Sequence, residues 1–283
     1  MSVHVLGGDA APAGSETTTD DRFEILPFGK SEEQAKTLTE PVRITITTSP
    51  KHGVDRSVDL GVRLRETGHP ITIHLAARMV RDDDHLDEIL VRCDESGIDD
   101  LFVIGGDAPE PLGPYTAASN VLELIAAHPS RPAKLGIGAY PEGHPLIAQP
   151  ELEAALAHKA ELADYMVTQL CFDTKTLLSW LEGVRAGGNQ LPLYVGAVGP
   201  IERRKLLEIS AKIGVGPSLR FVRKQRGLMT LFRSPADSAT TFFDHIAPTV
   251  GHHSLGIAGF HFFTFNELIA TWNWQRERWA AIT

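Results

Sequence analysis

Short runs of apolar and β-branched residues recur along this chain, separated by longer stretches of mixed polarity. Most of the runs are continuous rather than alternating, which is typical of parallel strands whose outer face is covered by helices. Eight of the runs are long enough to form strands. They are Phe23–Phe28, Val42–Thr47, Ile71–Leu75, Leu101–Ile104, Leu135–Ala139, Tyr165–Leu170, Leu193–Ala197 and Ile257–Phe262.

The stretches between the runs carry the signals of helices. Ser31–Gln34 has the spacing of a capping box, in which the serine and glutamine side chains each bond an unpaired backbone N–H. Asp84–Ser96 places apolar side chains on one face, and Gly97 can end that helix in the left-handed conformation. Asp173 precedes another amphipathic stretch as a candidate N-cap. Strands and helices therefore alternate along the chain.

This alternation predicts a single α/β domain. Eight strands that each lead into a helix favour a (β/α)8 TIM barrel over an open doubly wound sheet. We expect residues 22–283 to form this barrel, and residues 1–21, rich in Gly, Ala, Ser, Thr and Asp, to be a flexible, disordered tail. The gap before the last strand is the longest, and it predicts an extra helix anchored by Phe242, Phe243 and Ile246.

Composition and charge exclude several classes of protein. The 283-residue chain carries 27 Lys and Arg against 36 Asp and Glu, a net charge of −9. It therefore lacks the basic excess of a nucleic-acid or anionic-membrane binder. No apolar run approaches the roughly 20 residues that span a bilayer. Two cysteines cannot form a disulfide framework, and the N-terminus lacks a secretory signal pattern, so we expect a cytoplasmic protein.

Polar side chains follow or interrupt most of the predicted strands. In a TIM barrel the C-terminal ends of the strands converge on one mouth, where the chemistry takes place. Polar residues in apolar strands are costly unless they find partners, so several of them at one mouth indicate a site. The residues are Glu24, Thr47, Thr48, His74, Gly105–Asp107, Tyr140–His144, Thr168, Gln169, His261 and Asn266.

Each of these residues also has a structural interpretation. Gly105 and Gly106 can form a tight turn, or they can let a flat ring approach backbone N–H groups. Asp107 can cap a helix or contact a ligand. Histidines within strands, such as His74 and His261, are more often hydrogen-bonded core residues than ligands. The residue pattern leaves both interpretations open.

Sequence motifs for nucleotides and metals are absent. The chain has no G-x-G-x-x-G that opens a βαβ unit and no phosphate loop of the form G-x-x-x-x-G-K-[ST]. A dinucleotide can still bind over the mouth, with Lys159 as a candidate for its phosphates; the alternative for Lys159 is a solvated helix face. No metal-binding spacing occurs, so we expect no metal. A metal-dependent hydrolase or lyase would have to use His74, His144 and His261.

Five ordered segments resemble the methylenetetrahydrofolate reductase family. The resemblance runs from about Phe23 to the C-terminal helix, and the segment A-Y-P-E-G-H-P is its most specific part. The segments are Phe23–Pro27, Gly105–Pro109, Ala139–Pro145, Val167–Asp173 and Gly259–Asn266.

The resemblance implies a (β/α)8 barrel that binds FAD non-covalently, takes a hydride from NAD(P)H and reduces methylenetetrahydrofolate to 5-methyltetrahydrofolate. The nicotinamide and the folate would stack on the flavin in turn. This reaction belongs to one-carbon metabolism and supplies methionine biosynthesis. The reverse reaction, oxidation of 5-methyltetrahydrofolate, uses the same site.

The resemblance also implies roles for individual residues. Glu24 would be the general acid that opens the five-membered ring of the folate, and Asp107 would hold the pterin and tune the flavin. Gln169 would bind the pterin, and Arg203 stands at the position of a folate-stacking Phe. The positions that contact the cofactor in the family are Thr47, His74, Gly106, Tyr115, Tyr140, His144 and Lys159.

Departures from the family pattern keep other functions open. Gly105 stands where the family usually has Arg, so a cationic contact to the flavin is lost, and hydride could pass directly from NADH to the folate. The basic residues within 220–226 either meet the glutamate tail of a folate or form a solvated face. The chain could also be a catalytically silent barrel that serves as a partner subunit. A homo-oligomer is compatible with the sequence.

Overall fold

Eight parallel strands close into a barrel in the computed structural model, which describes residues 20–144, 146–201 and 235–282. Neighbouring strands pair in sequence order, and the last strand closes the ring by pairing with the first. The predicted (β/α)8 barrel is therefore confirmed. The strands are β1 (Arg22–Ile25), β2 (Arg43–Ile46), β3 (Ile71–Ala76), β4 (Asp100–Ile104), β5 (Lys134–Ala139), β6 (Tyr165–Thr168), β7 (Leu193–Val198) and β8 (Ile257–Phe263).

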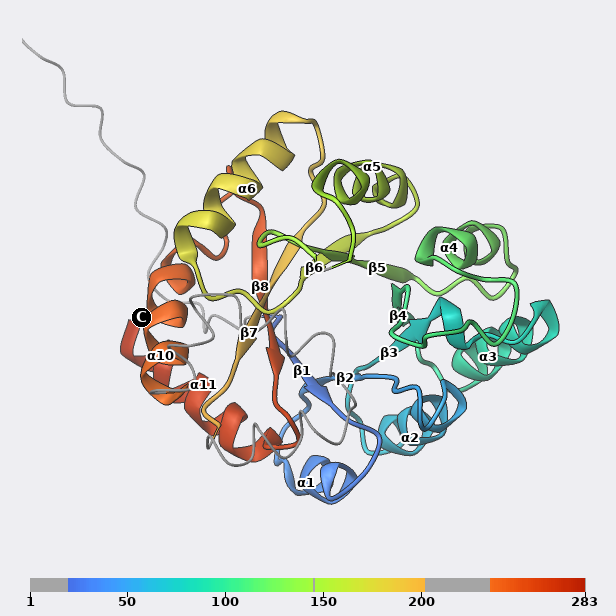
Figure 1. The fold of residues 1–283 in the computed structure, drawn as a ribbon. Coiled ribbons are helices and arrows are strands. Elements are labelled where there is room, and N and C mark those ends of the chain that lie inside the picture. Colours follow the sequence, from blue (N-terminus) through green and yellow to red (C-terminus); the bar gives the residue numbers. More distant parts are fainter. Residues whose placement is uncertain (1–19, 145, 202–234, 283) are drawn as a thin grey trace, which may run out of the picture.

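Helices surround the strands on the outside of the barrel (Figure 1). Apolar side chains of both layers form the main core between the strand ring and the helices. None of the described helices is long and apolar enough to cross a membrane. The α-helices are α1 (Ser31–Thr37), α2 (Asp55–Arg65), α3 (Asp83–Glu95), α4 (Ala118–Ala126), α5 (Gln149–Ala160), α6 (Thr174–Ala186), α10 (Pro235–Ile246) and α11 (Leu268–Ile282), and the short 3₁₀ helices are η1 (Ala77–Met79) and η2 (Ala247–Thr249).

All eight predicted strands are present, and the largest difference is in β1, which ends at Ile25 rather than Phe28. The N–H of Leu26 donates to Oδ1 of Asn266 at 2.8 Å instead of continuing the strand ladder. Pro27 has no N–H to donate. The chain therefore leaves the barrel directly after Ile25.

Three helix predictions are confirmed. α3 buries the predicted apolar face, and Gly97 beyond its end has a φ of 68°. The side chain of Asp173 accepts a hydrogen bond from the N–H of Thr176 at the start of α6. In the long gap before β8, the predicted anchor Phe243 is fully buried on α10.

The capping box predicted at Ser31–Gln34 is wrong. Ser31 is the first residue of α1, and its hydroxyl donates to the carbonyl oxygen of Leu26 at 2.9 Å. The side-chain amide of Gln34 donates to the carbonyl oxygen of Asn266 at 2.8 Å. Both side chains tie the helix to neighbouring loops rather than cap it.

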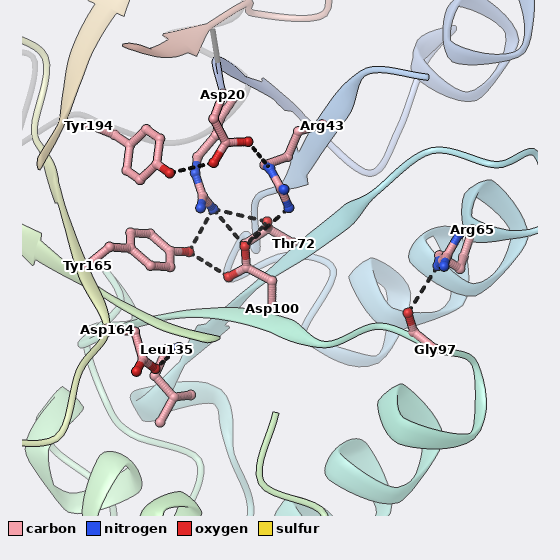
Figure 2. A network of polar contacts seen from close by, with 11 residues as sticks. Asp20, Arg43, Arg65, Thr72, Gly97, Asp100, Leu135, Asp164, Tyr165 and Tyr194 are labelled. Atoms are coloured by element: carbon pink, nitrogen blue, oxygen red, sulfur yellow. Dashed lines mark hydrogen bonds and ion pairs between the residues drawn. The ribbon is translucent and has the colours of Figure 1, made fainter. Parts of the chain in front are cut away.

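Buried charges fill the N-terminal end of the barrel (Figure 2). Arg22 forms an ion pair with Asp100 at 2.8 Å, and Arg43 lies 3.6 Å from the same carboxylate. The guanidinium of Arg22 lies between two tyrosine rings, 4.0 Å from the centroid of Tyr165 and 4.2 Å from that of Tyr194. We call these five residues the floor network.

The two residues directly before β1, Asp20 and Asp21, contact the barrel. Asp20 forms an ion pair with Arg43 at 2.8 Å. Asp21 is buried, and its carboxylate accepts a hydrogen bond from the N–H of Phe260 at 2.7 Å. These contacts correct the predicted tail, residues 1–21, at its last two positions; the rest of that segment lies outside the described residues.

The turn after β8 holds the loop after β1 in place. Phe265 and Asn266 have φ values of 50° and 62°, a conformation that costs a non-glycine residue about 1–3 kcal/mol. The side chain of Asn266 accepts from the N–H of Leu26, and it also donates to the carbonyl oxygen of Phe28 at 2.8 Å. The hydroxyl of Thr264 donates to the carbonyl oxygen of Glu24 at 2.6 Å. The turn therefore fixes the backbone at Glu24 and just beyond it.

We expect Asn266→Ala to lower the free energy of unfolding by about 2–4 kcal/mol. The N–H of Leu26 and the carbonyl oxygen of Phe28 lose their partner, and alanine tolerates a positive φ poorly. Urea denaturation measures the change. Gln190→Ala, at an exposed position, is the control and should stay within about 0.5 kcal/mol of wild type. Equal stability of the two variants would contradict the importance of this turn.

Candidate functional site

A large cleft opens at the C-terminal ends of the strands. Its volume is about 2470 Å³, more than a single small ligand needs. It extends from the barrel mouth along α5 and α6. Five of the residues to which the family resemblance gives a role line it, namely Gly106, Asp107, Tyr140, His144 and Lys159.

The loop after β4 presents Asp107 to the cleft. Gly106 has a φ of 89°, and a Cβ atom there would lie 2.9 Å from the Cβ of Ala76, so the position requires glycine. Arg78, in η1 after β3, donates to two carbonyl oxygens of this loop, both at 2.7 Å. The loop is therefore held in one shape, with the Asp107 carboxylate exposed to a ligand.

The loop after β5 places two aromatic side chains near Asp107. The rings of Tyr140 and His144 meet edge to face, with centroids 5.2 Å apart. Burial raises the pKa of Tyr140, and the negative charge of Asp107 adds to this effect. Burial lowers the pKa of His144 against the opposing charge of Asp107, so the ring is mostly neutral at pH 7. The cleft thus has an aromatic wall beside one carboxylate.

Lys159 reaches the cleft from α5. Its Nζ donates to the carbonyl oxygen of Gly138 at 3.0 Å, near the end of β5. Burial lowers the pKa of Lys159 to about 8, so the amine is still mostly protonated at pH 7. Lys51 and Lys175 line the cleft as well, and both are exposed. Three lysines can therefore meet phosphate groups in the cleft.

Three ionisable side chains meet inside the barrel, one each from β1, β3 and β8. Oε2 of Glu24 lies 3.1 Å from Nε2 of His261 and 3.7 Å from Nε2 of His74. His74 is 2% exposed and His261 is 1% exposed, whereas the Glu24 side chain keeps 13% of its surface exposed. We call these three residues the lumen cluster.

Burial sets the protonation of the lumen cluster. It raises the pKa of Glu24 to about 7, an effect that only a protonated His74 would oppose. It lowers the pKa of His74 to about 4 and that of His261 to about 3. At pH 7 both imidazoles are therefore neutral, while the carboxyl is present in both of its forms. Such a carboxyl can give or take a proton at neutral pH.

We expect the two buried histidines to make the protein sensitive to acid. Histidines of the unfolded chain titrate near 6.5, above the folded pKa of His74 at about 4 and of His261 at about 3. The unfolded state therefore binds more protons as the pH falls below about 6.5, and folding loses stability in that range. Thermal unfolding from pH 7 to pH 4 measures this loss. In the double variant His74→Gln and His261→Gln, the melting temperature should depend less on pH. The same pH dependence as in the wild type would contradict the prediction.

Thr47 and Gln169 lie directly after β2 and β6, at the same end of the barrel as the cleft. Neither lines the cleft, and the same holds for Glu24 and the other two lumen-cluster residues. The described site residues therefore form an upper level at the cleft and a lower level inside the barrel. Arg203 and the basic residues within 220–226 lie outside the described residues.

The structure does not bring Tyr115 to the cleft; the residue is buried, and its hydroxyl donates to the carboxylate of Asp83 on α3. Nor does it bring His144 into the cluster of His74 and His261, because His144 lies on the loop after β5. Within the described residues, the three histidines therefore do not form the metal centre considered for a hydrolase or lyase.

Two features of the site are not evident from the predicted strand ends. Arg78 is the first, although its position two residues after the end of a strand is a signal that could reveal it. The sequence indicates His261 as a core histidine or a ligand, but not as a partner of Glu24. Its contact with Glu24 depends on the closure of the barrel between β8 and β1, which no local pattern encodes.

Comparisons with known proteins identify relatives by sequence. The family model described as methylenetetrahydrofolate reductase matches residues 31–218, more than half of the chain. Methylenetetrahydrofolate reductase 1 of Schizosaccharomyces pombe is 27% identical over 127 residues, which cover 41% of this chain and 21% of the relative. Methylenetetrahydrofolate reductase 2 of Saccharomyces cerevisiae is 23% identical over 122 residues, which cover 39% of this chain and 20% of the relative. The match thus spans about a fifth of either yeast protein.

A solved structure shares the fold. It is an uncharacterized protein from Clostridium thermocellum that binds two copies of 5-methyl-5,6,7,8-tetrahydrofolic acid. The two structures superimpose with a TM-score of 0.60 at 14% sequence identity, over 92% of this chain and 95% of the other. At this identity the likeness establishes the barrel fold alone.

Proposed function

Because the chain belongs to the methylenetetrahydrofolate reductase family, we propose that it reduces methylenetetrahydrofolate to 5-methyltetrahydrofolate with a hydride that originates from NAD(P)H. The observation that carries this proposal is Glu24, a carboxyl inside the barrel whose pKa burial raises to about 7. The neighbour from Clostridium thermocellum, which binds 5-methyl-5,6,7,8-tetrahydrofolic acid, supports a folate as the ligand.

Glu24 is the general acid in this proposal. Its proton goes to one of the two nitrogens that the methylene group bridges, and the bond between that nitrogen and the methylene carbon breaks. An iminium remains on the other nitrogen, and the hydride adds to its carbon to give the methyl group. Glu24 is left as a carboxylate and takes up a proton before the next turnover. A pKa of about 7 makes both forms accessible at neutral pH.

Asp107 and Gln169 hold the pterin ring in this proposal. A pterin presents N–H donors and ring acceptors along one edge, which a carboxylate and an amide can pair with together. Both side chains are exposed at the C-terminal end of the barrel. Tyr140 and His144 provide the aromatic wall against which a flat ring can pack.

The cleft residues fit a dinucleotide. Gly105 and Gly106 carry no side chains, so a flat ring can approach their backbone. Lys51, Lys159 and Lys175 can neutralise a diphosphate. Bound FAD would accept a hydride from NAD(P)H and pass it to the folate. The same features fit the diphosphate of NAD(P)H, so the assignment of FAD rests on the family.

Direct transfer from NAD(P)H to the folate is a second candidate. Gly105 stands where the family usually has Arg, and Arg78, which lines the cleft, already donates to the carbonyl oxygens of the neighbouring loop. Among the described lining residues, no other arginine is available to a flavin phosphate. This observation favours a reductase that works without a flavin.

Anaerobic visible absorption and NADH oxidation test the proposal together. Flavin bands that bleach when 5-methyltetrahydrofolate is added would support reduction through FAD. A colourless protein that oxidises NADH only when methylenetetrahydrofolate is present would support direct transfer. Flavin bands that stay unchanged, with no folate-dependent oxidation of NADH, would indicate a flavoprotein with another substrate. A colourless protein that stays inactive after incubation with FAD would favour a catalytically silent partner subunit.

A further inference from the structure

We propose that His261 is a positioning residue that holds the carboxyl of Glu24 in the orientation from which it donates its proton. This inference rests on the proposed function, since it concerns the same carboxyl. Nε2 of His261 lies 3.1 Å from Oε2 of Glu24, which is hydrogen-bond distance. The two side chains meet across the seam where β8 closes the barrel against β1.

The surroundings of His261 determine which ring nitrogen carries the hydrogen. Nδ1 is buried, and it has no hydrogen-bond partner among the described residues. An unpartnered acceptor is less costly than an unpartnered N–H, so Nδ1 stays unprotonated and Nε2 carries the hydrogen. His261 therefore donates from Nε2 to Oε2 of Glu24. Oε2 is then the carbonyl oxygen of the protonated carboxyl, and Oε1 carries the acidic proton.

His74 is less suited to this role. Its Nε2 lies 3.7 Å from the same oxygen, and within the described residues neither of its nitrogens has a hydrogen-bond partner. Its ring meets Phe102 edge to face, with centroids 4.7 Å apart, and stacks on His261 at 5.9 Å. His74 therefore packs against the ring of His261 and limits its movement.

The charged groups around Glu24 leave His261 as its principal donor. In the floor network, Arg22 and Arg43 are paired with Asp100. The carboxylate of Asp107 at the mouth is exposed, and His74 is neutral at pH 7. When Glu24 has given up its proton, the N–H of His261 stabilises the carboxylate that remains. Inside the barrel, the titratable and charged groups that act on Glu24 or on the two histidines beside it are His74, His261, Arg22 and Asp100.

Removal of this donor should make Glu24 harder to ionise. We expect His261→Leu to raise the midpoint of the Glu24 titration by about 1–2 pH units, the usual effect of one hydrogen bond to a charged group. In His261→Gln the side-chain amide can donate from a position close to that of Nε2, so the midpoint should return close to the wild-type value. A histidine with only a packing role would change stability without moving the midpoint.

Carbon-13 NMR of glutamate side-chain carboxyl carbons measures this midpoint without turnover, and Glu24→Gln assigns the signal. His69→Gln is the matched control, because His69 is also buried but its ring bonds the backbone at Val42 and Ala35. The midpoint should not move in this control. An unchanged midpoint in His261→Leu would overturn the proposal. A midpoint in His261→Gln that is raised as far as in His261→Leu would also overturn it.

Failure of the proposed function would be recognised separately. In an active enzyme, the alkaline fall of kcat should move upward in His261→Leu together with the NMR midpoint, while the KM for NADH stays unchanged. A wild-type protein that is inactive, but whose Glu24 midpoint still moves in His261→Leu, would overturn the folate reaction and keep the coupling between the two side chains.

Metal analysis adds a check, because ligand-type atoms of the lumen cluster lie within 4.8 Å of one another. A stoichiometric transition metal in the purified protein would overturn the proposal.

Discussion

Glu24→Gln lowers the rate of folate reduction at pH 7 by about 10²- to 10⁴-fold, the usual contribution of a general acid. The amide keeps the size of the side chain and can accept the hydrogen bond from His261, but it has no acidic proton to give. Oxidation of NADH by an artificial acceptor should stay close to wild type, because that reaction does not require a proton on the folate. Steady-state assays with the two acceptors measure both rates.

Glu153→Gln is the matched control, since Glu153 is an exposed carboxyl that lines the same cleft on α5. It should retain most of the folate reduction. The pH dependence gives a second check: the acid must be protonated, so the wild-type rate falls as the pH rises through about 7. Glu24→Gln should not show this fall. Loss of both reactions in Glu24→Gln would contradict an acid role specific to the folate.

Local patterns were sufficient to predict the barrel, because each strand packs its outer face on helices and each amphipathic helix shows its buried face in the sequence. The predictions failed where distant contacts outweigh local chemistry. Ser31 is of a residue type that caps helices, but its hydroxyl donates to the loop after β1. Asp20 and Asp21 look like tail residues in the sequence, yet Arg43 and Trp279 bind their carboxylates.

The location of the candidate site was also predictable, whereas its internal geometry was not. Strand ends meet at one mouth in any TIM barrel, so the sequence alone could place Asp107, Tyr140 and Lys159 near one another. The pairing of Glu24 with His261 arises only when the first and last strands meet. Burial then sets the pKa of the carboxyl, and burial is a property of the whole fold.

Asp100→Asn lowers the free energy of unfolding by about 3–5 kcal/mol, the usual effect of breaking a buried ion pair. Asp100 is fully buried, and its carboxylate accepts hydrogen bonds from Arg22 at 2.8 Å, Thr72 at 3.0 Å and Tyr165 at 2.7 Å. Burial acts to lower the pKa of Arg22, but Tyr165 and Asp100 hold it above its ordinary value. Since a guanidinium does not deprotonate in proteins, the variant leaves a buried positive charge without its counter-ion.

Two comparisons separate this buried charge from general damage to the core. The double variant Arg22→Met and Asp100→Leu removes both charges, so we expect it to regain most of the lost stability. Glu32→Gln breaks the exposed ion pair with Arg63, 2.9 Å long, and should cost less than about 1 kcal/mol. Urea denaturation measures all three variants, provided that the m-value stays constant. Equal losses from the buried pair and the exposed pair would contradict the prediction.

Asp100→Asn also tests whether the floor network contributes to the reaction. Arg22 lies two residues before Glu24 in β1, and alternate residues of a strand face the same side, so both side chains point into the barrel. The N-terminal end of a TIM barrel serves stability, so kcat at low temperature, where the variant is folded, should stay within about twofold of wild type. A larger fall in kcat would mean that the floor network sets the position of Glu24. The fold and the candidate site would then depend on the same buried charges.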